Sequence, residues 1–149
     1  MNSGQATVDR REGRIVAIDL GERRLGLAVC DPTRTIASPA GAILRRAGKK
    51  IPVAKLIARA GELDAGEFVV GLPLDGDGND TPRAADARWL AAELTRRTGL
   101  PAQLVDERYT TAKARRAIRE MGGESSERRG DVDALAATVL LQHALELSR

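Results

Sequence analysis

Residues 14–21 read RIVAIDLG, an apolar run that is typical of a buried strand and that carries a single acid, Asp19. A carboxylate in such a run needs a reason, because a buried unpaired charge is normally ion-paired, hydrogen-bonded, bound to a metal or neutralised. Asp19 is therefore the first candidate functional residue. The alternative is that the strand ends at Ile18 and that Asp19 belongs to a turn with Gly21.

Outward from this run, the sequence predicts an α/β fold with the element order β-β-β-α-β-α-β-α-α. Cap signals bound several of the helices, with Thr81 and Pro82 opening one, Gly99 ending it, and Asp131 opening the last. Three opening strands followed by alternating helices and strands indicate a mixed sheet with helices on both faces. The predicted strands are 15–20, 25–31, 35–44, 68–72 and 102–105, and the predicted helices are 51–63, 81–98, 111–122 and 132–147.

Length and composition predict one globular domain over residues 14–149. The 149-residue chain can bury a core of its own, and 42% hydrophobic with 30% charged residues is ordinary for a globular protein. No apolar run approaches the roughly 20 residues that span a bilayer, so membrane insertion is not expected. Residues 1–13 are polar and are expected to form a disordered leader on a cytoplasmic protein.

The scarcity of cysteine and histidine narrows the possible chemistry. Cys30 is the only cysteine, which suits a small core residue, and His143 is the only histidine. Zinc hydrolase and Ser-His-Asp schemes need imidazole beside other site residues, so carboxylates must perform any catalysis. Basic clusters within 45–50, 115–119 and 128–129 suit a polyphosphate partner, although solvated helix faces are the alternative.

Two further acids stand where they can join Asp19. Glu107 follows the strand at 102–105, at the carboxyl edge where open α/β sheets place ligands, and Asp133 lies on the sheet-facing side of the last helix. Their alternatives are a surface ion pair for Glu107 and a helix-dipole role for Asp133. If the three converge, each pair at 4 Å repels by about 1 to 4 kcal/mol, which implies bound cations or raised pKa values. Oxygen ligands favour Mg²⁺ or Mn²⁺, and two such ions hydrolyse phosphodiesters without histidine or cysteine.

Four ordered motifs resemble the YqgF, or RuvX, family, whose members are named for Holliday junction resolution and for pre-16S rRNA processing. The motifs are DLGERRLGLAV at 19–29, VVGLPL at 69–74 followed by Asp77-Gly78, DERYTT at 106–111, and VDALAA at 132–137. Each motif alone is weak, but four in order over most of the chain are specific. The resemblance implies a ribonuclease H-like fold with strand order 3-2-1-4-5.

The resemblance also implies the residues of the site. Asp19, Glu107 and Asp133 would be the metal-binding and catalytic acids of a nuclease that holds two Mg²⁺ or Mn²⁺ ions. In many ribonuclease H-like enzymes the second acid comes instead from the end of the fourth strand, where this chain has residues 71–73. Nucleic-acid contacts are expected from Arg24, Arg108, Thr110, Thr111, Arg115 and Arg116. Asp131 stands where the family commonly has lysine, which adds negative charge beside the site.

The leading hypothesis is hydrolysis of a phosphodiester in structured RNA, with 5′-end maturation of pre-16S rRNA as the implied task, by a monomer or homodimer. The first alternative is a Holliday junction resolvase acting on four-way DNA junctions, and the second is a non-catalytic RNA-binding factor. A sugar kinase or ATPase is disfavoured because 149 residues leave no room for a second phosphate-binding domain. Calcium binding at 75–86 is disfavoured because Asp80 stands where an EF-hand needs glycine. Trp89 is expected to pack beneath its helix.

Overall fold

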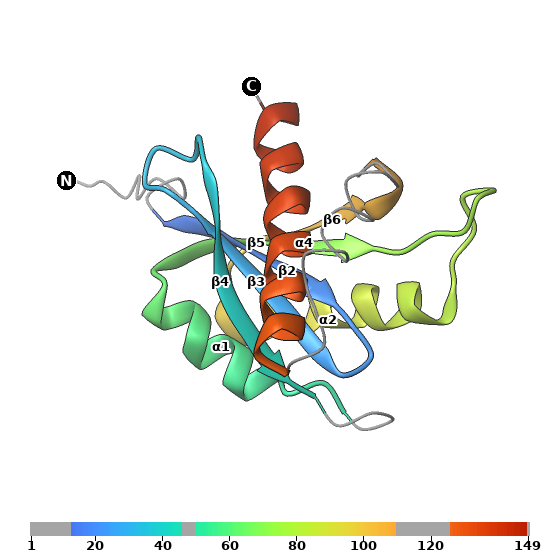
Figure 1. Cartoon of the computed structure of the whole chain (residues 1–149). Coiled ribbons are helices and arrows are strands. Elements are labelled where there is room, and N and C mark those ends of the chain that lie inside the picture. Colours follow the sequence, from blue (N-terminus) through green and yellow to red (C-terminus); the bar gives the residue numbers. More distant parts are fainter. Residues whose placement is uncertain (1–12, 46–49, 110–125, 149) are drawn as a thin grey trace.

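The centre of the computed structural model, which describes residues 13–45, 50–109 and 126–148, is a five-stranded sheet (Figure 1). The strands are β2 (Arg14–Leu20), β3 (Arg24–Cys30), β4 (Ala37–Leu44), β5 (Ala65–Leu72) and β6 (Ala102–Asp106). Across the sheet they are ordered β4-β3-β2-β5-β6. Strand β3 is antiparallel to both neighbours, while β2, β5 and β6 run parallel. The expected order 3-2-1-4-5 is confirmed.

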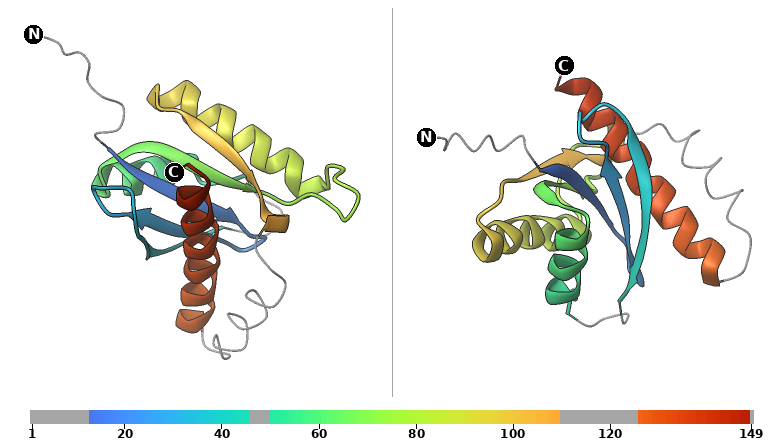
Figure 2. Two further views of the ribbon diagram at one scale, coloured as in Figure 1. Left: turned by 90° about the horizontal axis from the view of Figure 1, so that it is seen from above. Right: turned by 90° about the vertical axis from the view of Figure 1, so that its left-hand side faces the viewer.

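Helices cover both faces of the sheet, as predicted (Figures 1 and 2). Helices α1 (Val53–Glu62) and α2 (Pro82–Thr98) lie on one face, and α4 (Ser126–Leu147) crosses the other. Each face has its own core, because alternate residues of a strand point to opposite sides. In β2, Val16, Ile18 and Leu20 pack on the α1 and α2 side, whereas Ile15 and Ala17 pack on the α4 side. The helix expected at 111–122 lies outside the described residues.

Helix α2 begins and ends where its cap residues predict. The Thr81 hydroxyl accepts a hydrogen bond from the Ala84 backbone N–H at 3.2 Å, and Pro82 occupies the first turn. At the other end Gly99 adopts a left-handed conformation with φ of 75°, and its N–H donates to the Thr95 carbonyl. The turn before α2 is closed by the Asp75 carboxylate, which accepts from the N–H groups of Asp77 and Asn79.

Three predicted element starts are wrong: β5 begins at Ala65, not at Phe68, and two further starts differ for local reasons. Strand β4 begins at Ala37, not at Thr35, because the Asp31 carboxylate accepts the N–H groups of Thr35 and Ile36 at 2.7 and 2.8 Å and holds them in a turn. Helix α4 begins at Ser126, so Asp131 is not its N-cap. A single glycine inside a helix costs only about 1 kcal/mol, and Gly130 therefore does not end this one. Asp133 consequently lies about two turns inside α4.

The described fold begins at Gly13, which was expected to be the last residue of the leader. A Cβ added to Gly13 would lie 2.2 Å from the Gly66 Cα, so Gly13 packs directly against β5. Its carbonyl also accepts two hydrogen bonds from the Arg34 guanidinium, at 2.8 and 3.1 Å. The rest of the expected leader, residues 1–12, lies outside the described residues. In the described parts of the chain, no helix is long and apolar enough to cross a bilayer.

Candidate active site

Asp19 lies inside β2 and projects onto the α4 face of the sheet. It continues the alternation of Ile15 and Ala17, which pack beneath α4. Its backbone is paired with that of Gly26 on β3, so the alternative in which the strand ends at Ile18 is wrong. Asp19 is half-buried, whereas Leu20 beside it points into the opposite core. The single acid of the opening run therefore faces the same layer as the last helix.

Gly26 brings Asp133 close to Asp19. A Cβ added to Gly26 would lie 2.1 Å from the Asp133 carbonyl oxygen and 3.0 Å from the Asp133 Cβ. No residue other than glycine leaves room there, because these distances are far inside van der Waals contact. Helix α4 thus rests on the strand residue that is paired with Asp19. Asp19 and Asp133, which are 114 residues apart in the sequence, are therefore brought close together because Gly26 has no side chain.

Gly71 likewise leaves room for the Glu107 side chain close to the sheet. The pair Ile18↔Val70 places Gly71 one residue further along β5, level with Asp19. A Cβ on Gly71 would lie 2.5 Å from the Glu107 Oε1 and 3.0 Å from the Leu140 Cδ2 of α4. Glu107 begins the 3-10 turn η2 (Glu107–Tyr109) directly after β6, and its carboxylate reaches back over β5. It therefore occupies the space that a side chain at the end of the fourth strand would fill.

The three predicted acids lie over β3, β2 and β5 on one face of the sheet, but their carboxylates do not converge on a common position. Among residues 13–45, 50–109 and 126–148, no three Asp, Glu, His or Cys side chains converge closely enough to hold one ion. Asp133 is adjacent to the Asp19–Gly26 pair, and Glu107 covers Gly71.

Burial raises the pKa of the Asp133 carboxyl above its ordinary value, and the nearby positive charge of Arg24 opposes this shift. Arg24 starts β3 two residues before Gly26, so strand alternation places it on the same face. A desolvated carboxylate beside other acids is a group that a bound cation would stabilise. Arg24 supplies part of that positive charge in the absence of an ion.

The raised pKa of Asp133 predicts a pH dependence of folding. The folded protein holds the Asp133 proton to higher pH than the unfolded chain does, so this group lowers stability as pH rises from about 3.8 through its folded pKa. In Asp133→Asn this loss is absent. With a chelator present, the variant's gain in free energy of unfolding over wild type should grow from pH 4.5 to pH 7 in urea titrations. If the stability difference between Asp133→Asn and wild type did not change with pH, Asp133 would not have a raised pKa. The same would follow if this difference changed with pH no more than the difference measured for the exposed Asp77→Asn.

Arg108 is less available than the sequence suggests, because it is clamped to Asp106. Its Nη2 and Nε lie 2.7 and 2.9 Å from the Asp106 Oδ2, and its backbone N–H donates to the same carboxylate. These bonds hold the pKa of Asp106 below its usual value. The guanidinium is still 44% exposed, at the rim of the acid-bearing edge beside Gly78. Thr110, Thr111, Arg115 and Arg116 lie outside the described residues.

Gly26 and Gly71 are the site residues that sequence reasoning missed. Both stand inside strands and inside the family-like motifs, but no role was predicted for them. A glycine within a strand marks a bulge or the close approach of another backbone or ligand, and that signal was available. What it could not reveal was the approaching group, which comes from α4 in one case and from η2 in the other.

Comparison with known proteins agrees with this geometry. Residues 13–147 match the RuvX family, described as Holliday junction resolvase. The chain belongs to the RuvX family. A relative from Clavibacter michiganensis subsp. michiganensis, named "Putative pre-16S rRNA nuclease", is 40% identical over 139 residues, which are 93% of this chain and 86% of the relative. A relative of the same name from Anaeromyxobacter sp. is 41% identical over 133 residues, covering 89% and 96%.

A solved structure supports the fold assignment of this RuvX family member. It is T. thermophilus RuvC in complex with a Holliday junction substrate, at a TM-score of 0.55 and 16% identity, covering 91% of this chain and 95% of that one. The sheet order and the helices on both faces are those of the ribonuclease H-like fold, as the motif resemblance implied. The RuvX chain is thus a nuclease-family member, a hydrolase acting on ester bonds.

Proposed function

We propose that the chain is a metal-dependent nuclease that hydrolyses a phosphodiester in structured RNA, with 5′-end maturation of pre-16S rRNA as its task. The observation that carries the proposal is the pairing of Asp19 with Gly26, over which Asp133 packs. The names of the bacterial relatives support the choice of substrate. Residues 14–149 would form the single nuclease domain of a cytoplasmic monomer or homodimer.

The acids fit a divalent cation. Asp19, Glu107 and Asp133 offer only carboxylate oxygens, the ligands that Mg²⁺ and Mn²⁺ prefer. The absence of a side chain at Gly26 and Gly71 lets Asp133 and Glu107 pack directly on the strands that flank β2, which carries Asp19. Asp19 lies on the strand between the other two acids, and the three side chains together would hold the two ions. When bound, the ions would neutralise the phosphate and activate water for in-line attack.

The charge balance of the site supports cation binding. Two carboxylates 4 Å apart repel by about 1 to 4 kcal/mol over effective dielectric constants from 80 down to 20. Burial already raises the pKa of Asp133, and Arg24 offsets only part of that effect. Bound divalent cations would compensate the negative charge that the three acids bring to this face of the sheet. Asp131 would add to the negative charge near the site.

The substrate phosphates would be held by basic and hydroxyl side chains at the same edge. Arg24 lies close enough to Asp133 for its positive charge to lower the pKa of that acid. Arg108 would release Asp106 and bind a phosphate oxygen in its place. Thr110, Thr111, Arg115 and Arg116 would extend this contact. Several phosphate contacts made by arginine predict that substrate binding weakens steeply with salt.

A four-way DNA junction is the second candidate substrate. The family description favours it, since RuvX is described as a Holliday junction resolvase. Catalytic acids act on a phosphate group and carry no preference for the sugar, so the same three residues would serve either polymer. A non-catalytic RNA-binding role would leave the acids without a chemical task.

The test is cleavage of a pre-16S rRNA leader and a four-way DNA junction side by side, each with Mg²⁺, with Mn²⁺ and with a chelator. We expect metal-dependent cleavage of the RNA and little cleavage of the junction. Symmetrical nicking of the junction, with intact RNA, would transfer the function to junction resolution. Binding of RNA without cleavage of either substrate in both metals would favour the non-catalytic role.

A further inference from the structure

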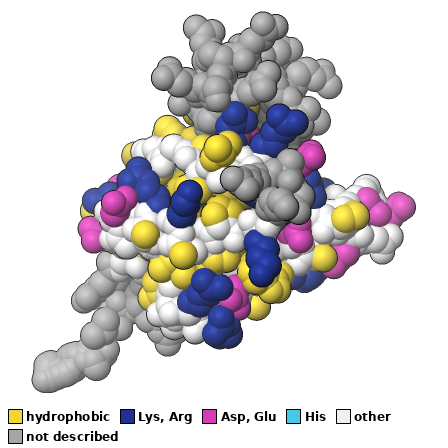
Figure 3. Space-filling model, turned by 90° about the horizontal axis from the view of Figure 1, so that it is seen from below, with side chains coloured by type: hydrophobic (Ala, Val, Ile, Leu, Met, Phe, Trp, Pro, Cys, Tyr) yellow, Lys and Arg dark blue, Asp and Glu magenta, His cyan; other side chains and the backbone are white. Residues whose placement is uncertain are grey.

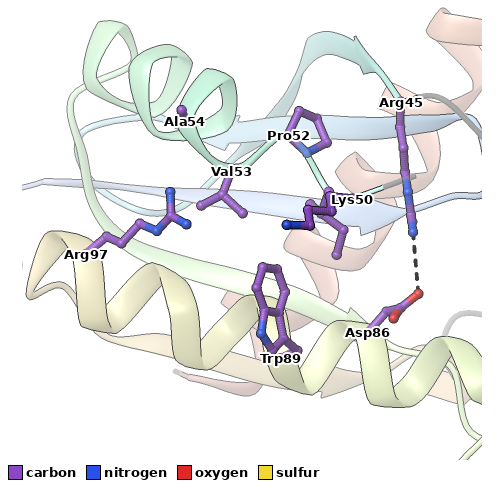
Figure 4. Close-up of a pocket in the computed structure, with 9 residues that line it drawn as sticks. Arg45, Lys50, Pro52, Val53, Ala54, Asp86, Trp89 and Arg97 are labelled. Carbon is purple, nitrogen blue, oxygen red and sulfur yellow. Dashed lines mark ion pairs between the residues drawn. The ribbon is translucent and has the colours of Figure 1, made fainter. Parts of the chain in front are cut away.

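A second hollow lies on the face of the sheet opposite the acids, between the start of α1 and the middle of α2 (Figure 4). It encloses about 550 Å³. Pro52 and Val53 line one side and Trp89 the other, and Arg45, Lys50 and Arg97 surround them. We call this hollow the Trp89 pocket. No sequence motif indicated it, and the three acids of the proposed active site do not line it.

The expectation that Trp89 packs beneath its helix is wrong, because its side chain is 48% exposed. The buried face of α2 is made by Ala84, Ala87, Leu90, Ala91 and Leu94, and Trp89 falls outside that stripe. In Figure 4 the indole points from α2 toward the start of α1. An exposed indole opposite apolar side chains is a surface on which a flat aromatic group can stack.

The charge of the Trp89 pocket is positive. Three cations, Arg45, Lys50 and Arg97, face one acid, Asp86, and that acid is already within 3.5 Å of the Arg45 guanidinium. Glu93 accepts the Arg97 Nε at 2.8 Å, which leaves the terminal nitrogens of Arg97 for another partner. Lys50 makes no ion pair within the described residues. Basic side chains also lie among hydrophobic ones on the face seen from below in Figure 3.

Arg45 connects the Trp89 pocket with the turn after Asp19. Its Nη1 donates to the Gly21 carbonyl at 3.2 Å, and its Nη2 lies 3.5 Å from the Asp86 Oδ2. Its Nε is buried and has no hydrogen-bond partner among the described residues. The Arg45 guanidinium is thus engaged with Gly21 and Asp86, and its positive charge adds to the potential of the pocket. Gly21 follows Asp19 by two residues, so one side chain separates the pocket wall from the acid-bearing turn.

We propose that the Trp89 pocket binds one nucleotide of a single-stranded segment of the substrate, with the base stacked on Trp89, the phosphate held by Lys50 and Arg97, and Arg45 adding positive charge. The proposal rests on the proposed nuclease function, since the ligand is a polynucleotide extending past the β2–β3 turn. A protein partner would also cover an exposed tryptophan, but three cations around one indole favour a base with phosphates. The pocket would thereby select substrates with an unpaired segment near the cleaved bond.

The test uses the full chain in a chelator, so that nothing is cleaved. Trp89 is the only tryptophan, and its fluorescence therefore reports directly on the pocket. Titration with a short single-stranded oligoribonucleotide should quench it saturably, and a blunt duplex of the same sequence should not. In anisotropy titrations with the labelled oligonucleotide, Trp89→Ala should weaken binding about 10-fold, and Trp89→Phe should restore most of it.

Lys50→Ala supplies the electrostatic arm of this test. Loss of one phosphate contact should reduce the slope of log affinity against log salt by about 0.7. Lys55→Ala is the matched control, because Lys55 is exposed on α1 but does not line the pocket. Equal effects of the two lysine variants, unaltered binding by Trp89→Ala, or a Trp89-dependent change of oligomeric state without any effect on the oligonucleotide would overturn the proposal. If the wild-type protein cleaves RNA with a metal present but binds the oligonucleotide equally well without Trp89, only the pocket proposal is wrong. If binding depends on Trp89 but the wild-type protein cleaves nothing, only the nuclease proposal is wrong.

Discussion

Asp19→Asn is expected to lower the rate of phosphodiester cleavage by about 10³-fold or more while leaving the fold and substrate binding intact. The variant replaces the carboxylate that lies between Asp133 and Glu107 with a neutral amide of the same size. Divalent cations supply several kcal/mol of transition-state stabilisation, and each 1.36 kcal/mol is tenfold in rate. The measurement is single-turnover cleavage of the pre-16S rRNA leader at saturating Mg²⁺ or Mn²⁺, with circular dichroism to verify the fold.

Asp77→Asn is the matched control, because it makes the same change of charge on an exposed acid in the turn before α2. Its cleavage rate should stay within about twofold of wild type, since exposed charges contribute little. Undiminished cleavage by pure Asp19→Asn protein would refute the proposed role of Asp19. Binding of the leader in a chelator should be no weaker for Asp19→Asn than for Asp77→Asn, because Asp19 repels phosphate when no cation is bound.

Gly26→Ala is expected to destabilise the protein by about 3 kcal/mol or more, which is the upper end of the cost of overpacking. The new methyl would lie 2.1 Å from the Asp133 carbonyl oxygen and 2.4 Å from the carbonyl carbon. Backbone atoms cannot turn aside as a side chain can, so α4 must move away from β3. Cleavage should fall as well, because Asp133 moves with the helix. Urea titration gives the free energy of unfolding, and the cleavage assay uses protein shown to be folded.

Gly61→Ala is the control for this glycine substitution. A Cβ at Gly61 meets nothing within 4 Å, and alanine favours a helix by up to about 1 kcal/mol over glycine, so α1 should become slightly more stable. If Gly26→Ala lay within about 0.5 kcal/mol of wild type, α4 would not be seated on β3 as described. Retained stability with lost cleavage would instead show that the helix shifts at little cost.

Much of this fold could be predicted because its signals are local. The apolar run at 14–20, the cap residues Thr81 and Gly99 and the alternation of strands and helices each depend on residues close in sequence. The errors lie at the starts of elements. The Asp31 carboxylate delays β4 to Ala37, and the helix-compatible residues between Ser126 and Asp131 start α4 earlier than predicted.

The candidate site divides in the same way. Asp19, Glu107 and Asp133 could be named as candidates from the sequence, because Asp19 lies in an apolar run, Asp133 lies on the apolar face of its helix, and all three lie in the family-like motifs. Their proximity could not be derived from composition, since it depends on how closely α4 approaches β3 and how η2 folds back over β5. Arg108 shows the opposite error: its type and motif suggest a free phosphate ligand, but Asp106 two residues earlier already binds it.

The sequence by itself determined the elements, their order, the family resemblance and the acids, because periodicity, caps and residue chemistry are properties of neighbouring residues. Only the tertiary structure decided that Gly26 and Gly71 seat Asp133 and Glu107, since contacts between distant segments depend on the packing of helices on the sheet. The same packing decided the fate of Trp89. Helical periodicity does not decide whether Trp89 lies on the buried or the exposed face of α2. Its exposed indole forms one wall of a pocket because the start of α1 lies opposite it.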